Sequence, residues 1–262
     1  MKLSVITVNF NNKLGLQSTI ESVRRQNCKD FEYIIVDGAS NDGSVDLIKS
    51  NTECIAYWVS EPDSGIYNAM NKGVRFATGD YCLFLNSGDT LYCESTIAEI
   101  LSKSIEADFV EGIICLQEQG GIFHYPLPSR TFSDYIYGVN NFHQASLIKR
   151  DLLLKVPYDE TYRIAADLKF NIESIVVHNC SYSPLDVVIS NYEGGGISRT
   201  VNHEDERNRL FCELIPQRIL ADYESMRFIK EWPGSMLWPF YAWISQCTFI
   251  LNLKNTLKRI KK

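Results

Sequence analysis

Several signatures of common protein classes are missing from this chain of 262 residues. Its eight cysteines include no Cys-x-x-Cys pair, which argues against a zinc ribbon and against a thioredoxin-like redox site. No secretory signal peptide is apparent, because the short apolar N-terminal run is β-branched and typical of a strand. Several cysteines lie within apolar runs, where they behave as small hydrophobic residues. We therefore expect a cytoplasmic protein with reduced thiols.

The chain also lacks a net positive charge and a glycine-rich phosphate loop. The net charge of −6 excludes the domain-wide positive field of a general nucleic-acid binder, so no nucleic-acid partner is expected. No Gly-x-Gly-x-x-Gly motif follows the first apolar run, which argues against a nicotinamide-dependent dehydrogenase. A nucleotidyltransferase would need a basic glycine-rich loop near the N-terminus, and none is present.

Three apolar runs in the first third of the chain each end in small and acidic residues. The run at 3–10 changes to polar residues at Asn11, the run at 33–36 leads into Asp37, and the run at 81–85 leads into 86–89. Ligands of open α/β sheets bind beyond the carboxyl ends of the strands. Acidic groups at that edge suit a divalent cation and a ribosylated base.

Strand-like and helix-like segments alternate along the chain, which predicts βαβ units and a mainly parallel sheet. Strands are expected at 3–10, 32–36, 55–59, 81–85, 109–116, 142–148 and 187–190. Helices are expected at 14–26, 45–49, 65–79, 166–174 and 203–230.

The motifs at 4–11, 35–43 and 61–73, with Gly79-Asp80-Tyr81, resemble the family 2 inverting glycosyltransferases of the GT-A fold. They are most similar to the bacterial branch that builds capsule, exopolysaccharide and O-antigen units. The resemblance covers residues 3–200 and implies an α/β fold, a Rossmann-like sheet flanked by helices. It implies a nucleotide-sugar-binding half at 1–110, an acceptor-binding half at 111–200 in the same catalytic domain, and a helical C-terminal extension at 201–262.

The resemblance implies a nucleoside diphosphate sugar as donor, with UDP as the expected nucleotide. Asp37 would accept a hydrogen bond from the base, which Thr7, Asn9 and Phe10 would frame. An aspartate before glycine also suits a simple turn or a helix cap.

A second group of residues would surround the donor. Asp63 either contacts the ribose or the sugar, or only caps the following helix. Asn71 and Lys72 would lie nearby, with Lys72 either pairing with phosphate or covering a helix surface.

The segment Asn86, Ser87, Gly88 and Asp89 stands where the family carries an acidic motif that binds Mn²⁺ or Mg²⁺. Asn86 replaces the usual aspartate and Gly88 has no side chain, so Asp89 is the one charged ligand left. One carboxylate can suffice, because substrate phosphates and water complete the shell of a hard cation. A plain glycine-aspartate turn after a strand is the alternative.

The resemblance places the general base at Asp167, where Ala166 replaces the family's usual glutamate. An aspartate in a first helical turn also serves the helix dipole alone. His143 and Gln144 would contact diphosphate or acceptor, although a histidine in a strand is often a packed residue. Arg199, after the glycines at 194–196, would close over diphosphate or belong to an ordinary loop.

The last stretch carries no charged residue from 232 to 253 and is followed by five lysines and arginines. Its prolines and polar residues make a poor membrane-spanning helix, whereas aromatic residues beside a basic tail suit the inner leaflet of an anionic membrane. The alternatives are a helix packed on the catalytic domain and a dimer contact.

These features together predict an inverting, metal-dependent transferase that moves a sugar to a hydroxyl of a glycan or lipid-linked acceptor in cell-surface polysaccharide biosynthesis. Because the metal motif is depleted, the second hypothesis is a catalytically inactive nucleotide-sugar-binding or scaffold protein of the same fold.

Overall fold

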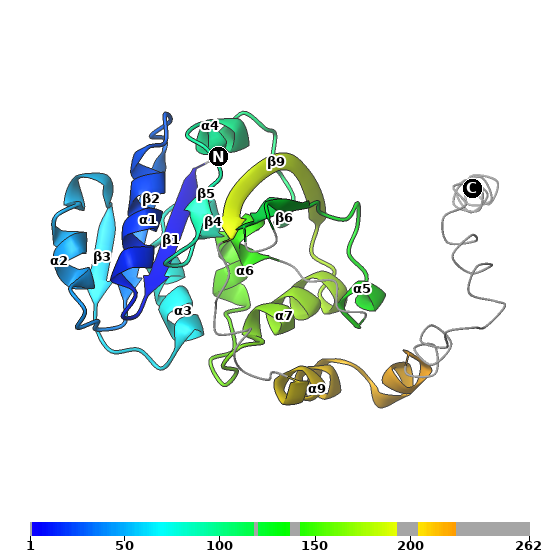
Figure 1. Cartoon of the computed structure of the whole chain (residues 1–262). Coiled ribbons are helices and arrows are strands. Elements are labelled where there is room, and N and C mark those ends of the chain that lie inside the picture. The colour runs from blue at the N-terminus through cyan, green and yellow to red at the C-terminus, as the bar shows by residue number, and fades with distance from the viewer. Residues whose placement is uncertain (1, 118–119, 137–141, 193–203, 224–262) are drawn as a thin grey trace. The chain divides into compact units, whose positions relative to one another are not determined.

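The structure is a computed structural model that describes residues 2–117, 120–136, 142–192 and 204–223 (Figure 1). Contacts within the chain divide it into two compact units, residues 1–210 and 211–262. Both halves of the expected catalytic domain lie in the first unit, which continues about ten residues beyond the boundary expected at residue 200. The account below concerns this first unit.

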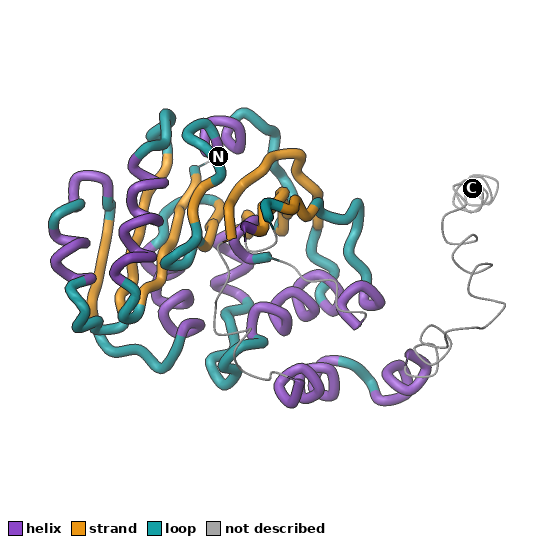
Figure 2. Tube along the Cα trace, in the orientation of Figure 1, coloured by secondary structure: helices purple, strands orange, loops and turns teal. Residues whose placement is uncertain are grey.

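A parallel sheet forms the N-terminal half of the first unit. Its strands lie in the order β3-β2-β1-β4, and every neighbouring pair is parallel. They are β1 (Leu3–Asn9), β2 (Phe31–Asp37), β3 (Tyr57–Ser60) and β4 (Tyr81–Phe84). The helices that connect them flank the strands (Figure 2) and are α1 (Lys13–Arg24), α2 (Ser44–Lys49) and α3 (Ile66–Phe76). This half of the sheet confirms the predicted βαβ pattern.

Burial explains why these segments form strands and a helix. All residues of β1 and β4 are buried, as expected for parallel strands covered on both faces. Helix α1 buries Leu16, Ile20 and Val23, which recur at a spacing typical of one helix face. Asn12 caps this helix, because its Oδ1 accepts a hydrogen bond from the amide of Gly15 at 3.1 Å.

The C-terminal half of the sheet is mixed and not parallel throughout. Strand β8 pairs antiparallel with both β4 and β6, while β6 pairs parallel with β9. The strands are β5 (Thr90–Leu91), β6 (Phe109–Leu116), β7 (Ile122–His124), β8 (Ser146–Lys149) and β9 (Tyr182–Tyr192). Register shifts between Glu111 and Ile114 accompany the strong curvature of β9 in Figure 1. The prediction of a mainly parallel sheet therefore holds for the N-terminal half only.

Three predicted elements differ in detail. The strand expected at 142–148 begins as a 3₁₀ turn, η3 (His143–Ala145), and only then becomes β8. Helix α7 (Ala166–Asn171) passes into a π-helical turn, η4 (Ile172–Val177). Strand β9 starts five residues before the apolar run at 187–190. Four short helical elements are not predicted from the sequence, because their segments show no clear hydrophobic periodicity. They are η1 (Thr52–Cys54), α4 (Thr96–Leu101), α5 (Phe132–Ile136) and α6 (Arg150–Lys155).

The single helix expected at 203–230 is interrupted: α9 (Glu204–Leu214) ends before Pro216, which has no amide hydrogen to continue it, and the described residues 217–223 are helical again. No helix among the described residues is long and apolar enough to cross a bilayer. The uncharged segment at 232–253 and the basic tail lie outside the described residues.

Candidate active site

A cleft of about 1290 Å³ opens beyond the carboxyl ends of β1, β2 and β4. Its other wall comes from the start of α3, from η3 and from the segment that leads into α7. Ten of the residues predicted from the sequence line it, namely Asn9, Phe10, Asp63, Asn86, Ser87, Gly88, Asp89, His143, Gln144 and Asp167. Segments from both halves of the first unit therefore meet at one cavity.

Asp37 lies behind the cleft wall and has no exposed surface. Its carboxylate accepts hydrogen bonds from Asn9 Nδ2 at 2.7 Å and from the Ser60 hydroxyl at 2.6 Å. The amide and hydroxyl of Ser40 supply two more, at 2.9 and 2.6 Å. The carboxylate thus ties together the ends of β1, β2 and β3, and its predicted hydrogen bond to the base stays a prediction.

Thr7, Asn71 and Lys72 also do not line the cleft. Thr7 is fully buried, and its hydroxyl donates to the carbonyl of Leu85 at 2.7 Å. Asn71 donates to the carbonyl of Tyr158 at 2.8 Å and accepts from the Tyr158 amide at 3.0 Å. These buried bonds hold the strand ends and the start of the second wall, and the predicted donor contacts of Thr7 and Asn71 stay predictions.

Lys72 points to the loop before α3. Its ammonium group lies 2.8 Å from the Glu61 carboxylate and donates to the carbonyl of Pro62 at 3.0 Å. It therefore holds the loop that carries Asp63, and its predicted pairing with phosphate stays a prediction.

Phe10, Gly38 and Asp63 form one lip of the cleft. Phe10 is 66% exposed and lines the cleft. Asp63 Oδ1 accepts from the Gly65 amide at 3.0 Å, so this residue does close a local turn. A Cβ at Gly38 would lie 2.6 Å from Asp63 Oδ2 and 3.1 Å from the Phe10 ring. The glycine is needed for this close approach.

The turn after β4 is held by helix α1. The Thr19 hydroxyl donates to the carbonyl of Asp89 at 2.8 Å and accepts from the Gly88 amide at 3.0 Å. Gly88 has a φ of +110°, a value that side chains disfavour. Asp89 is 6% exposed and lines the cleft. This role of Thr19 could not be predicted from its position in the chain, because its partners are about 70 positions away.

The cation site predicted at Asp89 has few protein ligands. Among the described residues, no three His, Cys, Asp or Glu side chains lie close enough together to hold a metal ion. Asn86 Oδ1, beside Asp89 in sequence, is buried and has no hydrogen-bond partner. One carboxylate fits a cation whose remaining ligands come from a diphosphate and from water.

Asp167 begins α7 and faces the cleft with its side chain 25% exposed. Its Oδ1 accepts from the Leu168 amide at 2.8 Å and from the Tyr67 hydroxyl at 3.1 Å. Its Oδ2 lies 3.5 Å from Nδ1 of His143. One carboxylate oxygen is therefore engaged by the protein, while the other faces an imidazole.

Tyr67 was not expected at this site. Burial, and then the charge of Asp167, hold the pKa of Tyr67 well above its ordinary value. The phenol stays protonated, and its one hydrogen is shared between two acceptors, Asp167 Oδ1 and the carbonyl oxygen of Ile164. A tyrosine at helical spacing in α3 resembles a core residue in sequence, so this role could not be read from it.

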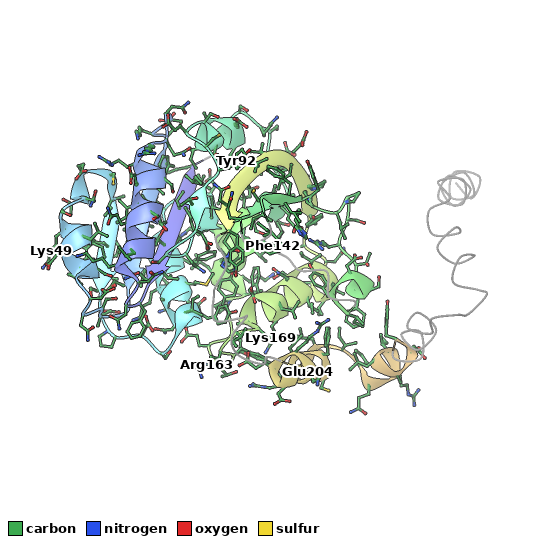
Figure 3. All side chains as sticks on the ribbon, in the orientation of Figure 1. Lys49, Tyr92, Phe142, Arg163, Lys169 and Glu204 are labelled. Atoms are coloured by element: carbon green, nitrogen blue, oxygen red, sulfur yellow. The ribbon has the colours of Figure 1, made fainter. Side chains whose placement is uncertain are left out.

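His143 connects the two walls. Its Nε2 lies 2.8 Å from Nδ2 of Asn86, at the end of β4, and its other ring nitrogen faces Asp167. Phe142, labelled in Figure 3, immediately precedes it and packs against His124 and Tyr192 at ring separations of 5.7 and 6.4 Å. The histidine thus stands between the predicted donor and acceptor sides.

Two further residues complete the second wall. Glu160 accepts from Asn68 at 2.8 Å and from Asn71 at 2.9 Å, and the bond from Asn71 is the main cause of its lowered pKa. Arg163 is exposed and brings a guanidinium to the lining. Arg199 lies outside the described residues, so its predicted place beside the diphosphate stays a prediction.

Comparisons with known proteins match this architecture. The family model described as glycosyl transferase family 2 matches residues 4–167, from β1 to the base candidate itself. A PGL/p-HBAD biosynthesis glycosyltransferase from Mycobacterium bovis is 31% identical over 219 residues, which are 79% of this chain and 83% of that protein.

Solved structures share the fold at low sequence identity. S. aureus TarS 1–349 in complex with UDP-GlcNAc matches with a TM-score of 0.62 at 19% identity, covering 77% of this chain and 62% of TarS 1–349. Glucosyl-3-phosphoglycerate synthase from Mycobacterium tuberculosis, in complex with Mn²⁺, UDP and glucosyl-3-phosphoglycerate, matches with a TM-score of 0.57 at 14% identity, covering 82% and 81% of the two chains. The fold is thereby the GT-A fold, and the chain belongs to glycosyl transferase family 2.

Proposed function

We propose that this glycosyltransferase moves a sugar from a UDP-linked donor to a hydroxyl of a glycan or lipid-linked acceptor, with inversion, in the synthesis of a cell-surface polysaccharide. The observation that carries the proposal is that Asp89 and Asp167, from opposite halves of the first unit, line one cleft. The relative named for PGL biosynthesis and the solved complexes with UDP support the donor class and a cell-envelope product.

The donor would lie over the ends of β1 and β2. The exposed Phe10 ring offers a face on which a base can stack, a contact typically worth about 1–3 kcal/mol per base. The Asp63 carboxylate, on the same lip, can accept from the ribose hydroxyls. Asp37 supports this wall from behind by holding Ser40 and Asn9.

The diphosphate would lie beside the turn at 86–89. Asp89 would hold the divalent cation, and a bound cation would supply positive charge to stabilise the departing diphosphate. Asn86, Ser87 and Gly88 line the cleft there, and the exposed guanidinium of Arg163 adds positive charge from the second wall.

The acceptor would enter on the side of Asp167. As its oxygen bonds to the anomeric carbon, the bond from that carbon to the diphosphate breaks and the hydroxyl proton moves to Asp167. Oδ2 is the oxygen that would take it, because Tyr67 and the Leu168 amide already donate to Oδ1. A single displacement of this kind inverts the configuration at the anomeric carbon.

The polysaccharide branch, the cytoplasmic location and the membrane contact rest on the sequence. A lipid-linked acceptor at the cytoplasmic face of the inner membrane would suit the aromatic, uncharged stretch at 232–253 and its basic tail. Flotation with anionic liposomes tests this: equal flotation of the full chain and of a chain ending at Glu231 would contradict the membrane contact.

Release of UDP from UDP-sugars in the presence of Mn²⁺ tests the proposed activity. Asp167→Asn and Asp89→Ala are each expected to lower the rate of release strongly, while Asp205→Asn, an exposed residue of α9, should leave it unchanged. Binding of UDP without any release, with or without candidate acceptors, would favour the second hypothesis of an inactive nucleotide-sugar-binding protein. Absence of UDP binding would contradict both.

A further inference from the structure

Helix α9 lies beyond the part of the chain that the family model matches, yet it contacts the segment that leads into Asp167. Glu206, in its first turn, accepts three hydrogen bonds from consecutive backbone amides. Oε1 accepts from Arg163 at 2.7 Å, and Oε2 accepts from Ile164 and Ala165, each at 2.9 Å. Arg163 and the nearby Glu204 are labelled in Figure 3.

This contact needs an ionised carboxylate. Partial burial by itself would raise the pKa of Glu206, but the three amide donors outweigh it and the pKa lies below its ordinary value. A carboxylate is the side chain that accepts several backbone amides at once, because it carries two oxygens and no hydrogen.

Two more residues of α9 hold the same wall. Arg209 donates to the Thr161 hydroxyl at 3.0 Å, and its guanidinium lies 4.4 Å from the centre of the Tyr162 ring. Arg207 donates to the carbonyls of Tyr135 and Ile136, both at 2.8 Å. The helix therefore fastens the end of α5 as well as the segment at 161–165.

The segment at 161–165, which α9 holds, is connected to Asp167 through Tyr67 and through the chain itself. Glu206 Oε2 holds the amides of Ile164 and Ala165, and the Ile164 carbonyl oxygen, which belongs to the same peptide group as the Ala165 amide, faces the Tyr67 hydroxyl. The same hydroxyl donates to Asp167 Oδ1. Residue 165 is also only two positions before the carboxylate itself. A displaced segment would move both Asp167 and the phenol that orients it.

We propose that Glu206 is a positioning residue for Asp167, so that this one side chain of α9 supports the catalytic carboxylate from outside the part of the chain that the family model matches. Glu206 does not line the cleft and touches no reacting atom. This inference rests on the proposed function in one respect, namely that Asp167 is the general base.

Glu206→Gln tests the proposal, because it keeps the shape and removes the charge. With Mn²⁺ and UDP-N-acetylglucosamine, UDP-glucose and UDP-galactose as probes, the expected result is a fall in kcat of tenfold or more. The KM for the donor and the Kd for UDP should change much less than kcat, because Phe10, Asp63 and Asp89 keep their places and the 163–165 segment reaches the diphosphate only through the Arg163 side chain. Asp205→Asn, an exposed neighbour on the same helix, is the matched control and should behave as wild type.

Two further measurements separate positioning from general stability. In an Asp167→Asn background, Glu206→Gln should cause no additional loss of kcat, because both changes act through one carboxylate. Amide hydrogen exchange should accelerate in the peptide 161–168 and not in β1 or β4. If Glu206→Gln does not fold, Glu206→Asp, whose shorter side chain reaches fewer amides, should give an intermediate kcat.

Unchanged kcat in the glutamine variant, or unchanged exchange at 161–168, would overturn the inference. A parallel loss of kcat and UDP affinity would do so too, since it would indicate general damage. Failure of the proposed function would give a different result. UDP release by the wild-type protein would then not depend on Asp167, while the exchange experiment would still report on the contact between Glu206 and the amides of 163–165.

Discussion

The imidazole of His143 lies with Nδ1 at 3.5 Å from Oδ2 of Asp167, while its Nε2 contacts the Asn86 side chain at 2.8 Å. Asn86 ends the parallel half of the sheet, and Asp167 begins a helix of the second wall. The histidine therefore sets the separation between the predicted diphosphate and acceptor sides. With Asn86 donating to Nε2, the ring hydrogen is on Nδ1 and points to the carboxylate.

Replacing Asp167 by asparagine should remove the base and keep the shape of the site. General-base catalysis typically contributes 10²–10⁴-fold, so we expect kcat to fall by about that factor. UDP affinity should be unchanged, because the nucleotide binds at the other wall. Steady-state UDP release and isothermal titration with UDP measure the two quantities, and a variant with wild-type kcat would exclude Asp167 as the base.

Replacing His143 by alanine should affect the chemistry less. The ring positions Asp167 and Asn86 but takes no proton in the proposed reaction, so a fall in kcat of roughly tenfold is expected, smaller than for Asp167→Asn. If His143→Ala and Asp167→Asn lowered kcat equally, the imidazole would be a partner in proton transfer and the proposed role of Oδ2 would need revision.

The exposed ring of Phe10 gives a prediction for the donor side. Loss of a stacking contact of about 1–3 kcal/mol corresponds to a rise in the Kd for UDP of about 5- to 150-fold in Phe10→Ala. Phe10→Tyr is the matched control, since it keeps the aromatic face. Calorimetric titration with UDP and Mn²⁺ measures the change, and equal affinities in all three proteins would show that the base binds elsewhere.

The close approach of Gly38 to Asp63 and Phe10 gives a second prediction for the same lip of the cleft. An alanine methyl would lie 2.6 Å from Asp63 Oδ2, so the carboxylate must turn away. We expect UDP affinity to fall on the order of tenfold while the thermal midpoint changes little, because the conflict involves the end of a side chain. The double variant Gly38→Ala, Asp63→Ala should bind UDP as weakly as Asp63→Ala alone. If the losses of UDP affinity in the two single variants added up in the double variant, the alanine methyl at position 38 would act through a group other than Asp63.

The parts of the fold that the sequence predicted are those with a local signal. Strands β1, β2 and β4 are apolar runs covered on both faces, and the polar residues after them marked the edge where the cleft lies. Strand direction carries no comparable signal. An apolar run such as 146–149 reads the same whether it pairs parallel or antiparallel, so the mixed half of the sheet could not be foreseen.

Ten of the predicted site residues line one cleft, and others have their hydrogen bonds within the protein. Thr7 and Asp37 are polar residues at strand ends, and sequence alone cannot tell whether such a residue faces a ligand or a buried partner. Their partners, Leu85 and Ser60, come from other strand ends. Tyr67 and Glu206 were missed for the same reason, because each acts on the 163–167 segment from a distant part of the chain.

The pH dependence of stability provides a test outside the active site. The Ser181 hydroxyl, followed by the Lys149 ammonium, lowers the pKa of Asp108 to about 2 from its ordinary value of 3.8. These bonds join the starts of β6 and β9 to the end of β8. Because the unfolded chain binds a proton more readily, this contribution is complete above about pH 4 and is lost as pH falls toward 2.

Asp108→Asn should therefore lower the free energy of unfolding at pH 6 and reduce its dependence on pH between about 4 and 2. Since the Asp108 side chain is 35% exposed, solvent screens the interaction and the effect should be modest. Urea unfolding at pH 6, 4 and 3 measures both quantities. Asp186→Asn, an exposed carboxylate on β9, is the control. An acid slope in Asp108→Asn as steep as in the control would show that other carboxylates carry the acid sensitivity.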